Sequence, residues 1–123
     1  MGIIEKMRLD GKKGFVTGGA RGIGKSVALA LCEAGADIAI VDMDIDEAQK
    51  TAEWLKAETS RNVIAIKTDV TDQADVNHMI DQILAAYGRI DIAFCNAGIC
   101  INAPAEEMTF EQWSKVINVN LNG

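Results

Sequence analysis

The sequence predicts an α/β protein, a doubly wound parallel sheet with helices on both faces, in three layers. Short apolar segments alternate with longer segments of helical periodicity along the 123 residues. Connections of helical length between consecutive strands imply parallel strands joined by crossovers. A glycine-rich turn, TGGARGIG at residues 17–24, follows the first apolar segment and opens the first helical one. The length suits a single domain, which we expect to cover residues 1–123.

The first half of the chain contains three expected strands and two expected helices. A strand over residues 14–17 (GFVT) leads through the glycines into a helix over residues 23–34, which Gly35 should end. The continuous apolar run IAIV at residues 38–41 indicates a strand covered on both faces. An amphipathic helix over residues 46–58 and a strand over residues 63–66 (VIAI) follow.

The second half continues the alternation. Asp72 is expected to be the N-cap of a helix that ends near Gly88. A fourth strand is expected over residues 90–95 (IDIAFC), as an apolar open edge of the sheet. The last helix should begin at Thr109, where Thr-x-x-Gln, formed by Thr109 and Gln112, indicates a capping box.

Composition argues against several classes of partner. The net charge of −6 disfavours binding to nucleic-acid phosphates and to acidic lipids, and no apolar run is long enough to span a membrane. Cys32, Cys95 and Cys100 form no C-x-x-C, and the single histidine, His78, cannot complete a zinc site. We therefore expect reduced thiols, no metal site and a cytoplasmic location. Cys95 is expected to be a small buried side chain.

The glycine turn fits two phosphate-binding patterns. Residues 19–26, GARGIGKS, match the P-loop pattern, in which Lys25 and Ser26 would serve a nucleoside triphosphate and Asp42 could help to hold magnesium. Residues 17–24 match a dinucleotide-binding turn instead, and both patterns use main-chain amides at a helix N-terminus. Asp42 stands 18 residues after Gly24, at the tip of the next strand, which favours the dinucleotide interpretation. Lys25 would then be a solvated helix residue.

Further motifs occur downstream of the turn. Asp69 and Val70 follow the third strand, NAG follows the fourth at residues 96–98, and N-x-x-G occupies residues 120–123. In this order and approximate spacing, the sequence resembles the short-chain dehydrogenase/reductase family over essentially its whole length. The resemblance implies a Rossmann-type fold, hydride transfer between NAD(P) and an alcohol or carbonyl substrate, and a homo-tetramer or dimer for the intact protein.

The resemblance also implies roles for individual residues. The glycines form the turn, the Ile23 main chain meets the pyrophosphate, Asp69 and Val70 meet the adenine, and the NAG segment borders the nicotinamide ribose. Asn120 resembles the catalytic asparagine that holds a water in the proton relay. The cofactor-binding residues so implied are Gly18, Arg21, Gly22, Ile23, Gly24, Asp42, Asp69, Val70, Asn96, Ala97 and Gly98.

Two residues bear on the choice of cofactor. A carboxylate at Asp42 accepts hydrogen bonds from ribose hydroxyls and repels a 2′-phosphate, which favours NAD. In relatives that use NADP, a basic residue at the position of Arg21 often pairs with that phosphate. NAD is the expected cofactor, and NADP stays possible because of Arg21.

The family's Tyr-x-x-x-Lys pair is absent from the chain. The only tyrosine is Tyr87, and Asp91 stands four residues after it. The resemblance implies that the catalytic Ser, Tyr and Lys lie beyond residue 123, so that these 123 residues would hold the adenosine half of the cofactor and be inactive alone. The alternatives are a non-catalytic nucleotide- or partner-binding fragment and, less favoured, a P-loop NTPase.

Overall fold

The computed structural model describes all 123 residues, Met1–Gly123, and contains one four-stranded sheet. The strand order is β3-β2-β1-β4, and every neighbouring pair is parallel. The strands are β1 (Lys13–Thr17), β2 (Asp37–Asp42), β3 (Ile64–Lys67) and β4 (Ile92–Phe94). The predicted doubly wound α/β fold is therefore confirmed, with β3 and β4 as the edge strands.

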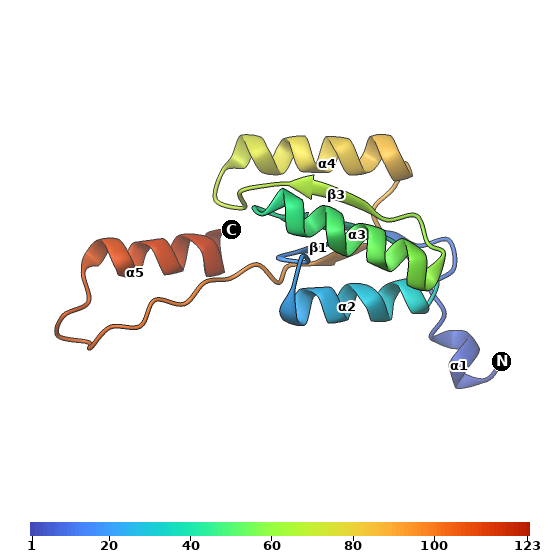
Figure 1. Cartoon of the computed structure of the whole chain (residues 1–123), viewed down its shortest axis with the longest axis horizontal. Coiled ribbons are helices and arrows are strands. Elements are labelled where there is room, and N and C mark those ends of the chain that lie inside the picture. Colours follow the sequence, from blue (N-terminus) through green and yellow to red (C-terminus); the bar gives the residue numbers. More distant parts are fainter.

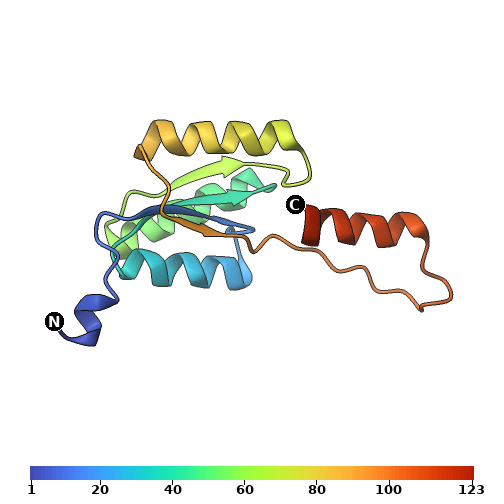
Figure 2. The same ribbon diagram turned by 180° about the vertical axis from the view of Figure 1, so that it is seen from behind.

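Helices cover both faces of this sheet. In Figure 1 and in the reverse view of Figure 2, α2 and α3 lie on one side of the strands and α4 lies on the other. The helices are α1 (Ile3–Lys6), α2 (Gly22–Glu33), α3 (Ile45–Thr59), α4 (Gln73–Tyr87) and α5 (Phe110–Ile117), which continues into a π-helical turn, η1 (Asn118–Asn122). The expected capping box at Thr109 and Gln112 is present.

Strand β2 explains how two cores form around one sheet. Side chains alternate between the faces of a strand. Ile38 and Ile40 are fully buried with α2 and α3, whereas Ala39 and Val41 are fully buried with α4. An apolar run without polar interruption is what a strand covered on both faces requires.

The C-terminal helix lies apart from the layers. After β4 the chain runs out in an extended segment, and α5 projects beyond the end of the sheet (Figure 1). Its apolar side chains are open to solvent, with Phe110 84% and Trp113 56% exposed. None of the helices is both long and apolar enough to cross a bilayer.

A charged cluster closes the end of the sheet where the strands begin. The buried carboxylate of Asp37 accepts hydrogen bonds from the Lys13 ammonium, from Arg61 Nε at 3.2 Å and from the Asn62 main-chain N–H at 3.0 Å. Burial opposes ionisation, but these donors hold the pKa of Asp37 below its usual range. At this same end the Tyr87 hydroxyl donates to the Asn62 carbonyl at 2.8 Å, and burial raises the pKa of Tyr87.

Candidate functional site

A cleft of about 510 Å³ lies at the opposite end of the sheet, where the strands finish. Strands β2 and β3 are added on one side of β1, and β4 then pairs with the other side of β1, so the strand order reverses at β1. In open α/β sheets, ligands bind outside the carboxyl ends of the strands at such a reversal. The volume is within the usual range for small-molecule sites. The lining residues are Gly18, Arg21, Ile23, Val41, Asp42, Met43, Thr68, Val70, Asn96, Ala97, Gly98, Ile99 and Val119.

The glycine turn brings the N-terminus of α2 to this cleft. Gly18 and Gly22 both have φ of +61°, a conformation that residues with a side chain rarely adopt. A Cβ on Gly24 would overlap the carbonyl oxygen of Gly18, so a glycine is needed for α2 to pack this closely. Arg21, the N-cap, does not cap α2 with its side chain, and the amides of Gly22 and Ile23 have no acceptor within the protein. Free amides at a helix N-terminus suit an anion such as a diphosphate.

Asp42 is held at the tip of β2. Its Oδ2 accepts the Ala20 N–H at 3.2 Å, and its Oδ1 accepts the Asp44 N–H at 3.1 Å. The Ala20 carbonyl in turn accepts a hydrogen bond from the Thr51 hydroxyl at 2.5 Å, which ties the turn to α3. An ionised carboxylate has about four lone-pair positions, so Asp42 can still accept two more hydrogen bonds.

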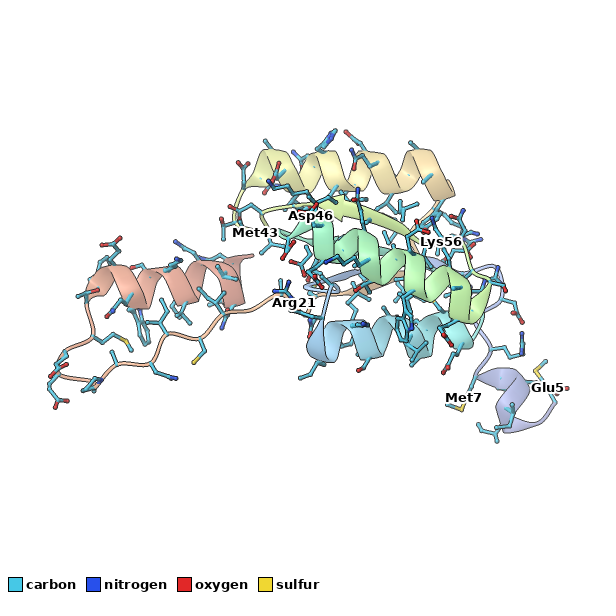
Figure 3. The ribbon with its side chains drawn as sticks, viewed as in Figure 1. Glu5, Met7, Arg21, Met43, Asp46 and Lys56 are labelled. Carbon is cyan, nitrogen blue, oxygen red and sulfur yellow. The ribbon has the colours of Figure 1, made fainter.

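Arg21 reaches from the turn to the start of α3. Its Nη2 lies 2.7 Å from Oδ2 of Asp44, with the Arg21 side chain 65% and the Asp44 side chain 44% exposed. Figure 3 shows Arg21 and Met43 at the end of the sheet that faces α5. Asp44 is also the N-cap of α3, and the Glu47 main-chain N–H together with the Arg21 guanidinium lowers the pKa of Asp44.

Asn96 connects the ends of β1 and β4. Its Nδ2 donates to the carbonyl oxygens of Thr17 and Gly18, each at 3.2 Å. The main-chain amides of Asn96 and Ala97 both donate to the Thr17 hydroxyl, at 2.9 and 3.0 Å. These four bonds fix the NAG segment against the glycine turn, so that both line one cleft.

Asn120 lies in η1, and its side chain reaches back to the loop after β4. Its Oδ1 accepts the Ile99 N–H at 2.8 Å, and its Nδ2 donates to the Ile99 carbonyl at 2.9 Å. A Cβ on Gly98 would lie 3.4 Å from Oδ1 of Asn120, in ordinary contact. The side-chain amide is therefore committed to this loop. Single π-helical turns are often found at functional sites.

The residues after β3 differ in how they meet the cleft. Val70 lines it, whereas the Asp69 carboxylate accepts the Thr71 N–H at 2.9 Å and the Thr71 hydroxyl at 2.6 Å, and these bonds lower the pKa of Asp69. Thr68 is 1% exposed, and its Oγ1 has no hydrogen-bond partner. Because no water-sized group can reach that oxygen, the Thr68 hydroxyl is not available to a ligand in this conformation.

Two side chains are placed differently from expectation. Lys25 is partly buried rather than fully solvated: its ammonium lies 4.5 Å from the centre of the Trp54 ring, in a cation–π contact between α2 and α3, away from the turn that a P-loop lysine would serve. Cys95 is exposed rather than buried, as are Ala93 and Phe94 before it in the edge strand β4. No cluster of three or more His, Cys, Asp or Glu side chains is placed to hold a metal ion.

Sequence reasoning missed two residues that shape the cleft. Thr17 is 6% exposed and accepts the two NAG amides, but a threonine at the end of a strand gives no sign of that pairing before the fold is known. Asp44 did carry a sign. Asp44 and Glu47 form an Asp-x-x-Glu pattern, which is typical of a helix start.

The chain was compared with known proteins. The profile of the short chain dehydrogenase family matches residues 12–123. The chain is 40% identical over 117 residues to a sorbitol dehydrogenase of Cereibacter sphaeroides, covering 95% of this chain and 44% of that protein. It is 40% identical over 116 residues to a D-threitol dehydrogenase of Mycolicibacterium smegmatis, with 94% and 44% covered.

Solved structures agree with this result. A short-chain type dehydrogenase/reductase from Mycobacterium marinum superimposes with a TM-score of 0.94 at 36% identity, over 98% of this chain and 49% of that one. The chain spans a little under half the length of the curated relatives it matches. The family profile covers all of the residues that build the sheet and the cleft. The chain belongs to the short-chain dehydrogenase/reductase family.

Proposed function

We propose that the chain supplies the nucleotide-binding part of an NAD-dependent oxidoreductase that acts on an alcohol or carbonyl substrate. One observation carries the proposal: the amides of Gly22 and Ile23, which have no acceptor within the protein, and the carboxylate of Asp42 line or border the same cleft. The amides suit the diphosphate of a dinucleotide, and the carboxylate suits the hydroxyls of the adenosine ribose. When bound, the nicotinamide would supply the hydride acceptor or donor.

Asp42 is the residue that would favour NAD over NADP. Each hydrogen bond from a ribose hydroxyl to a carboxylate contributes about 1.5–3 kcal/mol. A 2′-phosphate would remove one such donor and bring negative charge against Asp42, at about 4 kcal/mol per pair of unit charges 4 Å apart near a protein surface. Salt weakens this repulsion, so we expect NAD to bind at least about tenfold more tightly than NADP, a difference of about 1.4 kcal/mol.

The other residues near the cleft would orient the cofactor. Val70 would meet the adenine through its main chain, and Asp69 would do so after exchanging its bonds to Thr71. Asn96, Ala97 and Gly98 would border the nicotinamide ribose. Because Ile99 engages both side-chain groups of Asn120, the water in the proton relay would be held by the Asn120 main-chain carbonyl.

The proton-transferring groups would come from residues beyond Gly123, as a Ser and a Tyr-x-x-x-Lys pair. The coverage of 44% of the sorbitol and D-threitol dehydrogenases supports this division. The names of these relatives support a polyol or another secondary alcohol as the substrate. The exposed Phe110 and Trp113 of α5 support a homo-oligomer. A monomer in sedimentation of the full-length protein would contradict this part of the proposal.

Titration calorimetry on the full-length protein tests the cofactor assignment. Kd is measured for NAD, NADP and Mg·ATP in the unmodified protein, in Asp42→Asn and in Asp46→Asn. We expect NAD to bind most tightly, Asp42→Asn to reduce the NAD/NADP preference about tenfold or more, and Asp46→Asn to leave it unchanged. Asp46 is the matched control because it is an exposed carboxylate four residues after Asp42, in the first turn of α3. Tightest binding of Mg·ATP, or equal effects of the two variants, would overturn the proposal.

A further inference from the structure

The charge balance of the cleft depends on one cation. Among the lining residues, Arg21 is the only one with a cationic side chain and Asp42 is the only one with an anionic side chain. An anionic group brought near Asp42 would therefore meet net repulsion or net attraction according to where the Arg21 guanidinium lies. Arg21 is 65% exposed in its side chain, so its own packing does not fix its position.

The one ionic partner of Arg21 is Asp44. Oδ2 of Asp44 lies 2.7 Å from Nη2 of Arg21. Asp44 is itself anchored at two other points, since its Oδ1 accepts the Glu47 N–H at 3.2 Å and its own N–H donates to Asp42 at 3.1 Å. A flexible arginine is thus paired with a carboxylate whose position is set by the start of α3 and by the tip of β2.

We propose that Asp44 is a positioning residue that sets nucleotide selectivity by holding Arg21 away from the place of a 2′-phosphate. The inference rests on the proposed function, in which the cleft binds the adenosine half of a dinucleotide. Asp44 acts in two ways: it engages the one cation that could pair with the phosphate, and it adds a second negative charge beside Asp42. Because exposed ion pairs are weak, the share that acts through Arg21 should be about two- to fivefold in relative affinity.

The probes are adenosine 5′-monophosphate and adenosine 2′,5′-bisphosphate, which differ only in the 2′-phosphate. Their Kd values are measured by calorimetry at low ionic strength, and their ratio reports selectivity. The variant is Asp44→Asn, because asparagine is as good an N-cap as aspartate and removes only the charge. Asp44→Ser, which also caps, replaces it if Asp44→Asn unfolds. Glu47→Gln is the matched control, since Glu47 is a carboxylate on the same helix turn that pairs with Lys50 rather than with Arg21.

We expect Asp44→Asn to shift the ratio toward the bisphosphate by about fivefold or more. In an Arg21→Gln background the same change should give a shift at least twofold smaller, because Arg21 is no longer there to be released. Glu47→Gln should leave the ratio within about twofold of the unmodified protein. No shift in Asp44→Asn, or an equal shift with and without Arg21, would overturn the inference.

The outcomes also separate this inference from the proposed function. If the unmodified protein binds neither probe, the nucleotide site itself is wrong. If it binds the monophosphate more tightly and Asp44→Asn changes nothing, the site stands and the role of Asp44 is wrong. A raised affinity for both probes to the same degree would mean that Asp44 acts on general charge, which would equally contradict the role assigned to it.

Discussion

Thr17→Val tests the junction that holds the two sides of the cleft together. The substitution keeps the shape of a side chain that is 6% exposed but removes the oxygen that accepts the Asn96 and Ala97 amides. A buried donor left without a partner costs about 1–3 kcal/mol. Since both amides belong to half-buried residues that water can partly reach, we expect a total loss of about 2–4 kcal/mol of unfolding free energy, near the low end for two such donors.

Urea unfolding of the full-length protein measures this loss as a lower midpoint at an unchanged slope. Calorimetry on the same samples should give weaker NAD binding, because the NAG segment is no longer held against the glycine turn. Thr17→Ser is the matched control: it keeps the hydroxyl and should restore most of the stability and the affinity. If Thr17→Val had the midpoint and the NAD affinity of the unmodified protein, the two bonds to the Thr17 hydroxyl would not be what holds the NAG segment in place.

Three other substitutions test separate parts of the structure. Gly24→Ala should lower the free energy of unfolding by about 1–3 kcal/mol and weaken NAD binding, because the new Cβ overlaps the Gly18 carbonyl. Ser26→Ala, at an exposed position on the same helix, should change neither, and equal unfolding curves for the two variants would refute the overlap. Thr68→Val should leave the free energy of unfolding unchanged or raise it by about 1 kcal/mol, because it removes a buried hydroxyl without a partner. A clearly lower melting temperature would contradict this, since it would mean that the hydroxyl does have a hydrogen-bond partner. The pKa of Asp37 is lowered in the fold, so its contribution to stability is present above the ordinary aspartate pKa near 4 and is lost as pH falls through the lowered value. Asp37→Asn should therefore make the free energy of unfolding depend less on pH in that acidic range. An unchanged pH profile would contradict the pairing of an ionised Asp37 with its donors.

The layered fold was predictable because its signals are local. The run IAIV fixed β2 to within one residue at each end, and the Thr109–Gln112 pattern placed the start of α5 correctly. The fourth strand is shorter than expected, Ile92–Phe94 rather than residues 90–95, because only three of its residues pair with β1. Helix α1 was not predicted: it has four residues and none of them is buried, so its sequence shows no apolar periodicity.

Contacts between distant segments were not predictable in the same way. The position of Lys25 over Trp54 depends on how α2 and α3 pack, which neither helix encodes alone. Pairing of Arg21 with Asp44 likewise joins two loops 23 residues apart. For the cleft, sequence motifs identified residues that the structure does place along one wall, such as Gly18 and Asn96, because the carboxyl ends of parallel strands meet at one edge of a sheet.

A crystal structure of the full-length protein with NAD bound tests the central claim most directly. We expect the adenosine ribose hydroxyls within about 2.6–3.2 Å of the Asp42 carboxylate and the diphosphate against the main-chain amides of Gly22 and Ile23. A ribose bound elsewhere while Asp42 keeps only its bonds to Ala20 and Asp44, or a diphosphate remote from the start of α2, would contradict the account.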